Sequence, residues 1–229
     1  MHMKPTLSAC LAFGAFILPL AANASCGWGD INLRNAQAAV VTPAKQHFVM
    51  HADATNHCPS DSKQCQTKAY LVKGDVVVTG TKEGDYVCSG YVTAGGNLML
   101  EWLPVAALEA APADQQKPAD WTGKWHVYGN DIEIAPKGDA LAVDGDATWQ
   151  MGDNVHVGEV HGVVKPVNDQ IAFATDGENA VPFAQGGPDD CAIKMIRRGP
   201  YLVVEDNYKC GGLNVSFTAV YKRGVGKKR

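Results

Sequence analysis

The run CAIKMIRRGPYLVVEDNYKC, residues 191–210, decides the fold of the second half of the chain. It holds two stretches rich in aliphatic and β-branched residues, separated by the turn signal Arg198-Gly199-Pro200. In a hairpin about this turn, Cys191 and Cys210 lie at nearly equal distances from the centre and face each other. Opposed β carbons are ~4.5 to 5.5 Å apart, which is close enough for a disulfide. The sequence therefore predicts a hairpin closed by a Cys191–Cys210 bridge, which contributes about 3 kcal/mol on the chain-entropy model.

Similar strand runs continue on both sides of this hairpin. Gly, Asn, Asp or Pro separates them at intervals of about 8 to 12 residues, which is typical of antiparallel sandwiches and barrels. No helical periodicity extends beyond two turns, so we expect the whole chain to be all-β. For residues 121–223 we expect an up-and-down antiparallel β-barrel or sandwich of about eight strands. The expected strands are 125–128, 131–135, 140–143, 147–151, 155–164, 170–175, 191–197, 201–205 and 215–222.

A change of composition separates this barrel from the residues before it. Residues 109–120, EAAPADQQKPAD, contain two prolines and no aromatic or β-branched residue. Such a segment cannot form a buried core, so we expect a linker there. It would join a first module, residues 25–108, to the barrel module, residues 121–223, which a basic tail follows at 224–229. The strands expected in the first module are 69–72, 76–79, 86–92 and 98–103.

The first module resembles bacterial SH3-like domains over about residues 65–108. The resemblance is carried by Gly74-Asp75 before a β-branched strand, by the aromatic residues of the next strand, and by Trp102-Leu103-Pro104 before a short terminal turn. It implies a small barrel with an aromatic groove that holds extended peptides. The alternative is that Trp102 and one tyrosine belong to the core. The residues that would line such a groove are Tyr70, Tyr86, Tyr91 and Trp102.

The second module is similar to lipocalin-like barrels at its two ends. Its first strand opens with Gly123-Lys124-Trp125, and its last strand ends with the basic residues Lys222 and Arg223. This resemblance implies a carrier of a small apolar ligand. An interior filled by large side chains would leave no room for that ligand. The side chains that would fill it are Trp125, Phe173, Phe217 and Tyr221.

The N-terminus has the three parts of a secretion signal: Lys4, an apolar run at residues 7–22, and an Ala-x-Ala sequence that ends at Ala24. We expect residues 1–24 to be removed by cleavage near Ala24-Ser25, which gives a periplasmic or secreted protein. The apolar run is shorter than the ~20 residues of a membrane span, so we expect no transmembrane segment. Acylation of Cys26, as in a lipoprotein, is the alternative left open here.

Cleavage would remove Cys10 and leave six cysteines. An even number in an oxidising compartment predicts a set of disulfides. The hairpin argument pairs Cys191 with Cys210. The remaining four all lie in the first module and allow three connectivities, among which the sequence does not decide; they are Cys26, Cys58, Cys65 and Cys88.

Three other kinds of site were considered. His47, His51 and His57 lie near Cys58, but an oxidised cysteine is not a metal ligand, so we expect no metal site. No motif of a known catalytic or cofactor-binding site is present, such as Gly-x-Ser-x-Gly or His-Glu-x-x-His, so we expect a non-catalytic protein without a cofactor. An excess of acidic residues, 24 against 20 basic, argues against a nucleic-acid partner.

These features together predict a non-catalytic, exported binding protein of the bacterial cell envelope. Its partner would be a peptidoglycan-type peptide or a protein, and a role as an inhibitor or immunity factor is compatible with this build. The first alternative is a lipocalin-like carrier. The second is an envelope hydrolase, because catalytic groups are recognised by a geometry that the sequence does not show.

Overall fold

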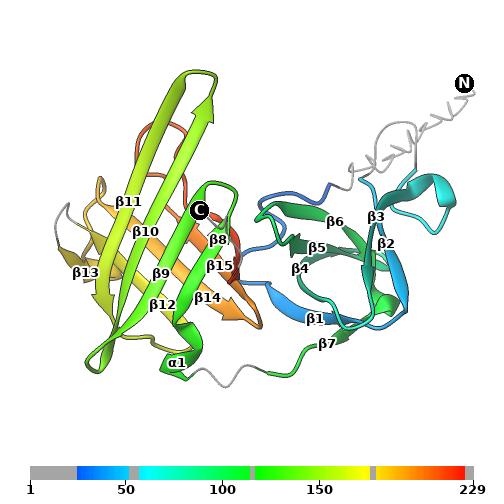
Figure 1. Cartoon of the computed structure of the whole chain (residues 1–229), viewed down its shortest axis with the longest axis horizontal. Coiled ribbons are helices and arrows are strands. Elements are labelled where there is room, and N and C mark those ends of the chain that lie inside the picture. The colour runs from blue at the N-terminus through cyan, green and yellow to red at the C-terminus, as the bar shows by residue number, and fades with distance from the viewer. Residues whose placement is uncertain (1–24, 52–56, 114–116, 176–178, 225–229) are drawn as a thin grey trace, which may run out of the picture.

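The computed structural model describes residues 25–51, 57–113, 117–175 and 179–224. It consists of two antiparallel sheets that lie side by side (Figure 1), so the all-β prediction is confirmed. The expected signal at residues 1–24, and the expected basic tail apart from Gly224, lie outside the described residues.

The first sheet is curled and has seven strands in the order β3-β2-β6-β5-β4-β1-β7. Two single-turn 3₁₀ helices, η1 (Lys63–Cys65) and η2 (Val105–Ala107), precede β3 and β7. Its strands are β1 (Gln37–Val41), β2 (Lys45–Val49), β3 (Gln66–Val72), β4 (Val76–Glu83), β5 (Tyr86–Val92), β6 (Leu98–Pro104) and β7 (Leu108–Ala110).

The second sheet has nine strands in the order β11-β10-β9-β8-β16-β15-β14-β12-β13 and is curled into a nearly closed barrel. The helix α1 (Pro118–Trp121) precedes it, and η3 (Phe183–Gln185) follows β13. Its strands are β8 (Gly123–Val127), β9 (Asn130–Lys137), β10 (Ala140–Met151), β11 (Asn154–Val164), β12 (Gln170–Thr175), β13 (Ala180–Pro182), β14 (Cys191–Arg198), β15 (Tyr201–Asp206) and β16 (Ala219–Arg223).

The barrel is joined by its first and last strands. Arg223 of β16 pairs with Trp125 of β8, and the Arg223 guanidinium lies 4.5 Å from the centre of the Trp125 ring. At the other end of the sheet order, β11 packs beside β12 and β13 at Gly162. A β carbon added to Gly162 would lie about 3 Å from Phe173 and Ala180, so the absence of a side chain allows this close approach.

The barrel interior is filled with side chains. Alternate residues of each strand point inward, and the largest of them have no exposed surface. The helix α1 lies at one end of the barrel (Figure 1), where Trp121 is buried and its carbonyl accepts a hydrogen bond from Trp125 Nε1 at 3.0 Å. Fully buried aromatic residues of this sheet are Trp121, Trp125, Phe173, Tyr201, Phe217 and Tyr221.

Several elements differ from those expected from the sequence. β10 is one continuous strand, because Gly145 marks the place where the Phe217 ring approaches the backbone rather than a turn. β16 begins at Ala219 instead of residue 215. The expected linker at 109–120 holds the end of β7 and most of α1, since β7 needs only main-chain pairing with β1 and no bulky side chains. The short strands β1, β2 and β13 were not predicted.

The two sheets contact each other along an interface that we call the seam. Five side chains of the second sheet form hydrogen bonds with main-chain groups of the first. Four of them donate to carbonyl groups: Arg198 Nε to Ala36 (2.8 Å), the Tyr201 hydroxyl to Val76 (2.6 Å), Lys222 Nζ to Val92 (3.2 Å) and the Tyr128 hydroxyl to Leu98 (2.8 Å). The fifth, Glu205, accepts a hydrogen bond from Leu33 N–H at 2.8 Å. Buried side chains of both sheets also form one continuous apolar cluster. The two sheets therefore pack as one body.

Lys222 and Gly96 show how closely the sheets approach. The Lys222 ammonium lies 4.6 Å from the Tyr91 ring centre and 5.8 Å from that of Tyr201, and burial lowers its pKa. Gly96, in the turn between β5 and β6, has a φ of 81°, and a β carbon there would lie 2.4 Å from the His126 ring. The Gly96 carbonyl accepts a hydrogen bond from Tyr128 N–H at 2.7 Å.

Candidate functional site

The four aromatic residues predicted to line a groove do not share one exposed surface. Trp102 is 1% exposed and lies in the core, and Tyr86 is buried with its hydroxyl donated to Asp61 at 2.6 Å. Tyr91 is half-buried beside Lys222 in the seam. Tyr70 is exposed, with the Lys45 ammonium 4.2 Å from its ring centre. The alternative interpretation, in which Trp102 and one tyrosine belong to the core, therefore agrees better with the positions of Trp102 and Tyr86.

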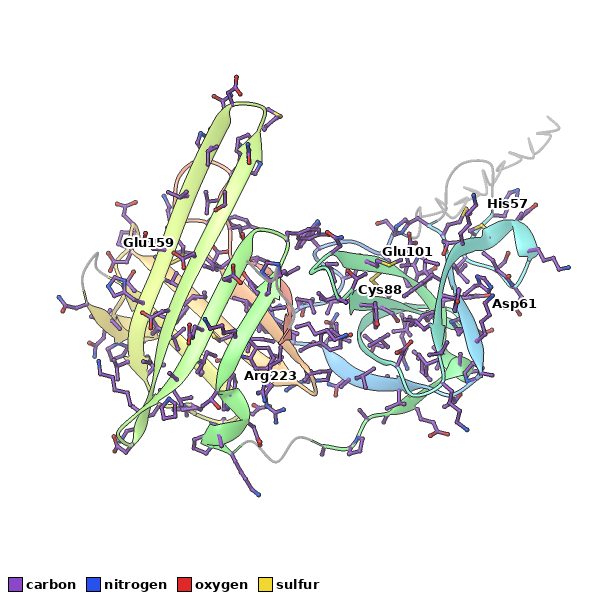
Figure 2. The ribbon with its side chains drawn as sticks, in the orientation of Figure 1. His57, Asp61, Cys88, Glu101, Glu159 and Arg223 are labelled. Carbon is purple, nitrogen blue, oxygen red and sulfur yellow. A yellow bond between two sulfur atoms is a disulfide. The ribbon has the colours of Figure 1, made fainter. Side chains whose placement is uncertain are left out.

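The six cysteines in the described part of the chain all form disulfides. Cys191 is bonded to Cys210, as the hairpin argument predicted. In the first sheet, Cys26 is bonded to Cys88 and Cys58 to Cys65, which is one of the three connectivities left open. Each bridge stays within one sheet and its loops. Figure 2 shows Cys88 in the middle of the first sheet, near Glu101.

Two of the three histidines near Cys58, His47 and His51, contact other groups. His47 Nδ1 lies 2.9 Å from the Thr67 carbonyl. His51 Nδ1 accepts a hydrogen bond from Cys26 N–H at 2.9 Å, and its Nε2 lies 3.4 Å from Glu101 Oε2. Within the described residues, no group of three or more His, Cys, Asp or Glu side chains is arranged to hold a metal ion.

A different set of aromatic residues surrounds an open pocket where the two sheets meet. This pocket, which we call the seam cleft, has a volume of about 330 Å³. One wall is Trp28, from the loop before β1, and the rest of the lining comes from the second sheet. Side chains at the seam cleft are Trp28, Tyr128, Asn130, Thr148, Trp149, Tyr208, Asn214, Val215, Ser216, Thr218 and Ala219.

Trp28 is placed by a short, cross-linked loop. The neighbouring Cys26 is bonded to Cys88 of β5, and Gly27 N–H donates to Asp30 Oδ2 at 2.8 Å. Gly80 lies under the same loop, where the Asp30 carbonyl would meet any added β carbon. The Trp28 side chain is 53% exposed, and its ring centre lies 6.0 Å from that of Tyr128. The loop thus presents an indole ring to solvent on a fixed backbone.

Tyr128, in the turn between β8 and β9, lies beside Trp28 at the seam cleft. Its φ of 51° is rare for tyrosine. Two hydrogen bonds to the first sheet fix it, from its N–H to Gly96 and from its hydroxyl to Leu98. The ring nevertheless remains 47% exposed. Burial raises the pKa of its hydroxyl, so Tyr128 is neutral at physiological pH.

Tyr208 lies on the loop between β15 and β16, which is also fixed. The Cys191–Cys210 bridge closes it, Asn207 bonds the main chain of Ala192 and Asp190, and Gly212 N–H donates to the Val157 carbonyl at 3.0 Å. Tyr208 has a φ of 59° and is 70% exposed. A tyrosine that is held rigidly and still left in solvent is a ready contact surface.

The floor of the seam cleft consists of hydroxyl groups with a fixed orientation. Ser216 and Thr218 both donate their hydroxyl hydrogens to Asp206 Oδ1, at 2.6 Å each. Ser216 Oγ accepts Thr218 N–H, and Thr218 Oγ1 accepts Asp206 N–H, both at 3.0 Å. Each hydroxyl oxygen has two lone pairs, so each can still accept one more hydrogen bond. Neither hydroxyl has a hydrogen left to donate to a ligand. The floor therefore favours a ligand that donates hydrogen bonds.

Only weak signals of this site are present in the sequence. Trp28 stands between two glycines, and Tyr128 precedes Gly129 at a place where hairpin turns prefer Asn. Trp149 of β10 is only half-buried and stacks on His156, with ring centres 5.1 Å apart. The loop at 207–216, which carries Tyr208, is rich in turn-forming residues around Cys210. What the sequence could not show is that Trp28 meets these residues.

A larger groove and an acidic face lie elsewhere on the molecule. The groove, of about 690 Å³, runs beside β1 and β7, and its lining includes Ala111, Pro112 and Ala113 of the connection to the second sheet as well as Asp169 and Arg198. On the outer face of β9, β10 and β11, acidic residues face each other across the strands. Figure 2 shows one of them, Glu159, on the side of the barrel away from the first sheet. We call this the acidic face: Asp131, Glu133, Asp144, Asp146 and Glu159, all exposed.

Comparison of the chain with family models, with curated proteins and with solved structures finds no significant match. None of the helices in the described part of the chain has the length and hydropathy needed to span a bilayer.

Proposed function

We propose that this protein is an exported, non-catalytic binding protein of the bacterial cell envelope, and that it contacts peptidoglycan through the seam cleft. The observation that carries the proposal is the set of exposed aromatic rings, from both sheets, above a floor of oriented hydroxyl groups. Aromatic side chains give large contact area at low entropic cost, and nearby hydroxyl and amide groups provide hydrogen bonds.

Export is supported by two features. The N-terminal residues have the pattern of a cleavable signal, with cleavage expected near Ala24-Ser25. Three disulfides are typical of proteins that fold in an oxidising compartment such as the periplasm. Cleavage at that position would leave Trp28 close to the new N-terminus and the seam cleft intact.

A surface ligand is favoured over one held inside the barrel. Four large side chains inside the barrel distinguish a filled interior from a ligand cavity. All four are fully buried: Trp125, Phe173, Phe217 and Tyr221. A carrier of small apolar molecules needs a cavity in that place. We therefore prefer envelope binding to the lipocalin-like alternative.

Retention on purified peptidoglycan tests the proposal. We expect the mature protein to sediment with purified sacculi, and we expect the double variant Trp28→Ala, Tyr208→Ala to lose about tenfold or more in affinity. Tyr70→Ala is the matched control, since Tyr70 is 52% exposed on the first sheet, outside the seam cleft. Equal sedimentation of all three proteins, or none by the wild type, would contradict the proposal.

A protein partner is the second candidate, and the acidic face favours it. Asp131 and Glu159 both pair with Asp146, and Glu133 pairs with Asp144. Like charges directly opposite each other destabilise a sheet. Lys124, 3.3 Å from Glu133, and His126, 2.8 Å from Asp131, offset part of this repulsion, and a cationic partner would relieve the rest. The exposed Val155 and Val157, beside this face on β11, would add apolar contact. Such a partner fits the role of an inhibitor of a basic, wall-attacking enzyme.

Charge removal separates this candidate from the first. We expect the triple variant Asp144→Asn, Asp146→Asn, Glu159→Gln to weaken capture of a cationic envelope protein and to leave retention on sacculi unchanged. The control Glu83→Gln, Asp85→Asn, Glu109→Gln removes the same charge from exposed positions of the first sheet. If both triples weaken capture equally, only net charge matters and the acidic face is not the site.

A further inference from the structure

We propose that the ligand of the seam cleft is the uncharged amino-sugar backbone of peptidoglycan rather than its stem peptides. This inference rests on the proposed function and narrows it to one chemical class. It depends on three properties of the cleft: the charge of its lining, the direction of its hydrogen bonds and the exposed faces of its rings.

The lining of the seam cleft has no charged side chain. Its polar groups are the amides of Asn130 and Asn214 and the hydroxyls of Thr148, Ser216, Thr218 and the tyrosines. The nearby Lys209 is directed to Asp189, with Nζ 3.6 Å from Oδ1. Stem peptides of peptidoglycan carry free carboxylates and amines, which such a lining leaves unpaired at a cost in free energy. An N-acetylated sugar chain carries no charge that needs a partner.

The floor requires a ligand with hydrogen-bond donors. The Ser216 and Thr218 hydroxyls have given their hydrogens to Asp206, so they can only accept. Sugar hydroxyls and acetamido N–H groups are donors. A proline-rich peptide, the other common ligand of aromatic grooves, has no N–H at its prolines, and an acyl chain has no donor at all. Both would leave the floor unsatisfied, so the direction of these hydrogen bonds favours a sugar.

The aromatic walls fit the shape of a sugar ring. Trp28, Tyr128 and Tyr208 are between 47% and 70% exposed, although aromatic side chains usually bury their rings. The negative face of an aromatic ring attracts positively polarised C–H groups, which line the apolar face of a pyranose. Flat rings on two walls and acceptors below thus match a ring with an apolar face and a rim of hydroxyl groups.

The cleft is organised before any ligand arrives. Tyr128 and Tyr208 each hold a positive φ, which costs free energy in a tyrosine. A disulfide fixes the loop of Tyr208, another fixes the loop of Trp28, and two hydrogen bonds to the first sheet fix Tyr128. A rigid site loses little entropy on binding, which matters for a ligand that offers a few weak contacts.

Titration with two soluble fragments tests the inference. The uncharged probe is the tetramer of N-acetylglucosamine, and the charged probe is the isolated stem tripeptide. We expect the tetramer to quench the fluorescence of Trp28 and to give a binding isotherm, and we expect no binding of the tripeptide. Because the contact is uncharged, the affinity should change by less than about twofold between low and high NaCl.

Variants of the mature protein complete the test. Trp28→Ala and Tyr208→Ala should each reduce tetramer affinity by about tenfold, and Tyr70→Ala should leave it unchanged. Since the two cleft side chains are exposed, both variants should keep the wild-type melting temperature. Thr218→Val, which removes one floor acceptor and keeps the shape, should weaken the tetramer as well, with circular dichroism as the check on its fold.

The outcomes distinguish this inference from the function on which it rests. Sedimentation with sacculi together with binding of the tripeptide, and not of the tetramer, would overturn the sugar assignment and leave the envelope function standing. Tetramer binding that survives Trp28→Ala and Tyr208→Ala would overturn the location. Tetramer binding at the seam cleft without any sedimentation would support the ligand class and contradict the envelope function.

Discussion

Tyr128 holds a left-handed backbone conformation in a two-residue turn, Tyr128-Gly129, between β8 and β9. Asn would suit this position better than tyrosine, because it tolerates a positive φ. Tyrosine there costs on the order of 1 kcal/mol or more. Its ring faces Trp28 and its hydroxyl reaches the first sheet, so we interpret this local cost as the consequence of forming the seam cleft.

The variant Tyr128→Asn tests that interpretation. The turn should become more favourable, while the hydrogen bond to the Leu98 carbonyl is lost, so the free energy of unfolding should change by less than about 1 kcal/mol. Affinity for the N-acetylglucosamine tetramer should fall by about tenfold, because one wall is gone. Urea denaturation and calorimetric titration measure the two effects. Retained affinity would show that the ring does not touch the ligand.

Glu101 is a half-buried carboxylate whose cost depends on pH. Its Oε2 is buried and accepts no hydrogen bond within the described residues, and the nearest basic group is His51, at 3.4 Å. Burial raises the pKa of Glu101 above its ordinary value of 4.5, and His51 opposes the shift. Above the raised pKa, the folded state carries an ionised group that is better hydrated when unfolded. Below 4.5 both states are protonated, and this cost disappears.

We therefore expect Glu101→Gln to raise the melting temperature at pH 7.5, and we expect this gain to decrease as the pH falls towards 4. The exposed Glu109→Gln serves as the control and should show no gain at either pH. Differential scanning calorimetry at both values measures the difference. An equal gain at pH 7.5 and pH 4 would mean that the effect does not come from ionisation.

At the scale of the elements, the disulfides differ in the length of chain that they close. Cys26–Cys88 spans 62 residues, Cys191–Cys210 spans 19 and Cys58–Cys65 spans 7. On the chain-entropy model these lengths correspond to about 4, about 3 and about 2 kcal/mol. Pairwise replacement by alanine should lower the free energy of unfolding in that order, as measured by guanidinium denaturation. A reversed order would show that native-state contacts dominate over chain entropy.

Most strands of the barrel could be predicted from periodicity and turn residues, and the exceptions have physical causes. Gly145 reads as a turn in the sequence, whereas in the structure it makes room for Phe217. Ser216 and Thr218 lie in a run of alternating residues, but their hydroxyls bond Asp206, and β16 starts only at Ala219. β13 has three residues and ends in proline, which is too short for a pattern.

The seam cleft was harder to predict than the strands. Its walls come from Trp28 in one half of the chain and from Tyr128 and Tyr208 in the other, and no local pattern joins residues so distant in sequence. The predicted aromatic groove has a local sequence pattern, but the structure does not form it. Tyr86 and Trp102 are strand aromatics like those of a peptide groove, but whether a strand aromatic faces solvent or core depends on the curl of the sheet.

At the scale of the whole molecule, the seam makes the two sheets depend on each other. Gly96 is a point of close approach, since a β carbon there would lie 2.4 Å from the His126 ring. We expect Gly96→Ala to lower the free energy of unfolding through backbone strain of about 1 to 2 kcal/mol, and further through the clash with His126. The seam cleft should also weaken, because the Gly96 carbonyl holds Tyr128.

Gly74→Ala is the matched control for this prediction. Gly74 also has a positive φ, 93°, but no atom lies within 4 Å of its added β carbon. Thermal denaturation should therefore show a larger loss for Gly96→Ala than for Gly74→Ala, and tetramer affinity should fall only in the former. Equal losses would mean that backbone strain, and not contact between the sheets, determines the result.

The hydrogen bonds named across the seam are one-sided. Arg198, Tyr201, Lys222, Tyr128 and Glu205 supply the side chains, and the first sheet supplies only carbonyls and one N–H, which almost any amino acid possesses. Mutational tolerance should therefore be unequal. In a saturation library selected for folding, Val76 and the buried Ala36 and Val92 should accept other apolar residues of similar size without loss of these hydrogen bonds, whereas Arg198 and Tyr201 should accept few replacements. The first half of the chain could therefore vary in sequence at these positions during evolution and still keep its hydrogen bonds to the second sheet.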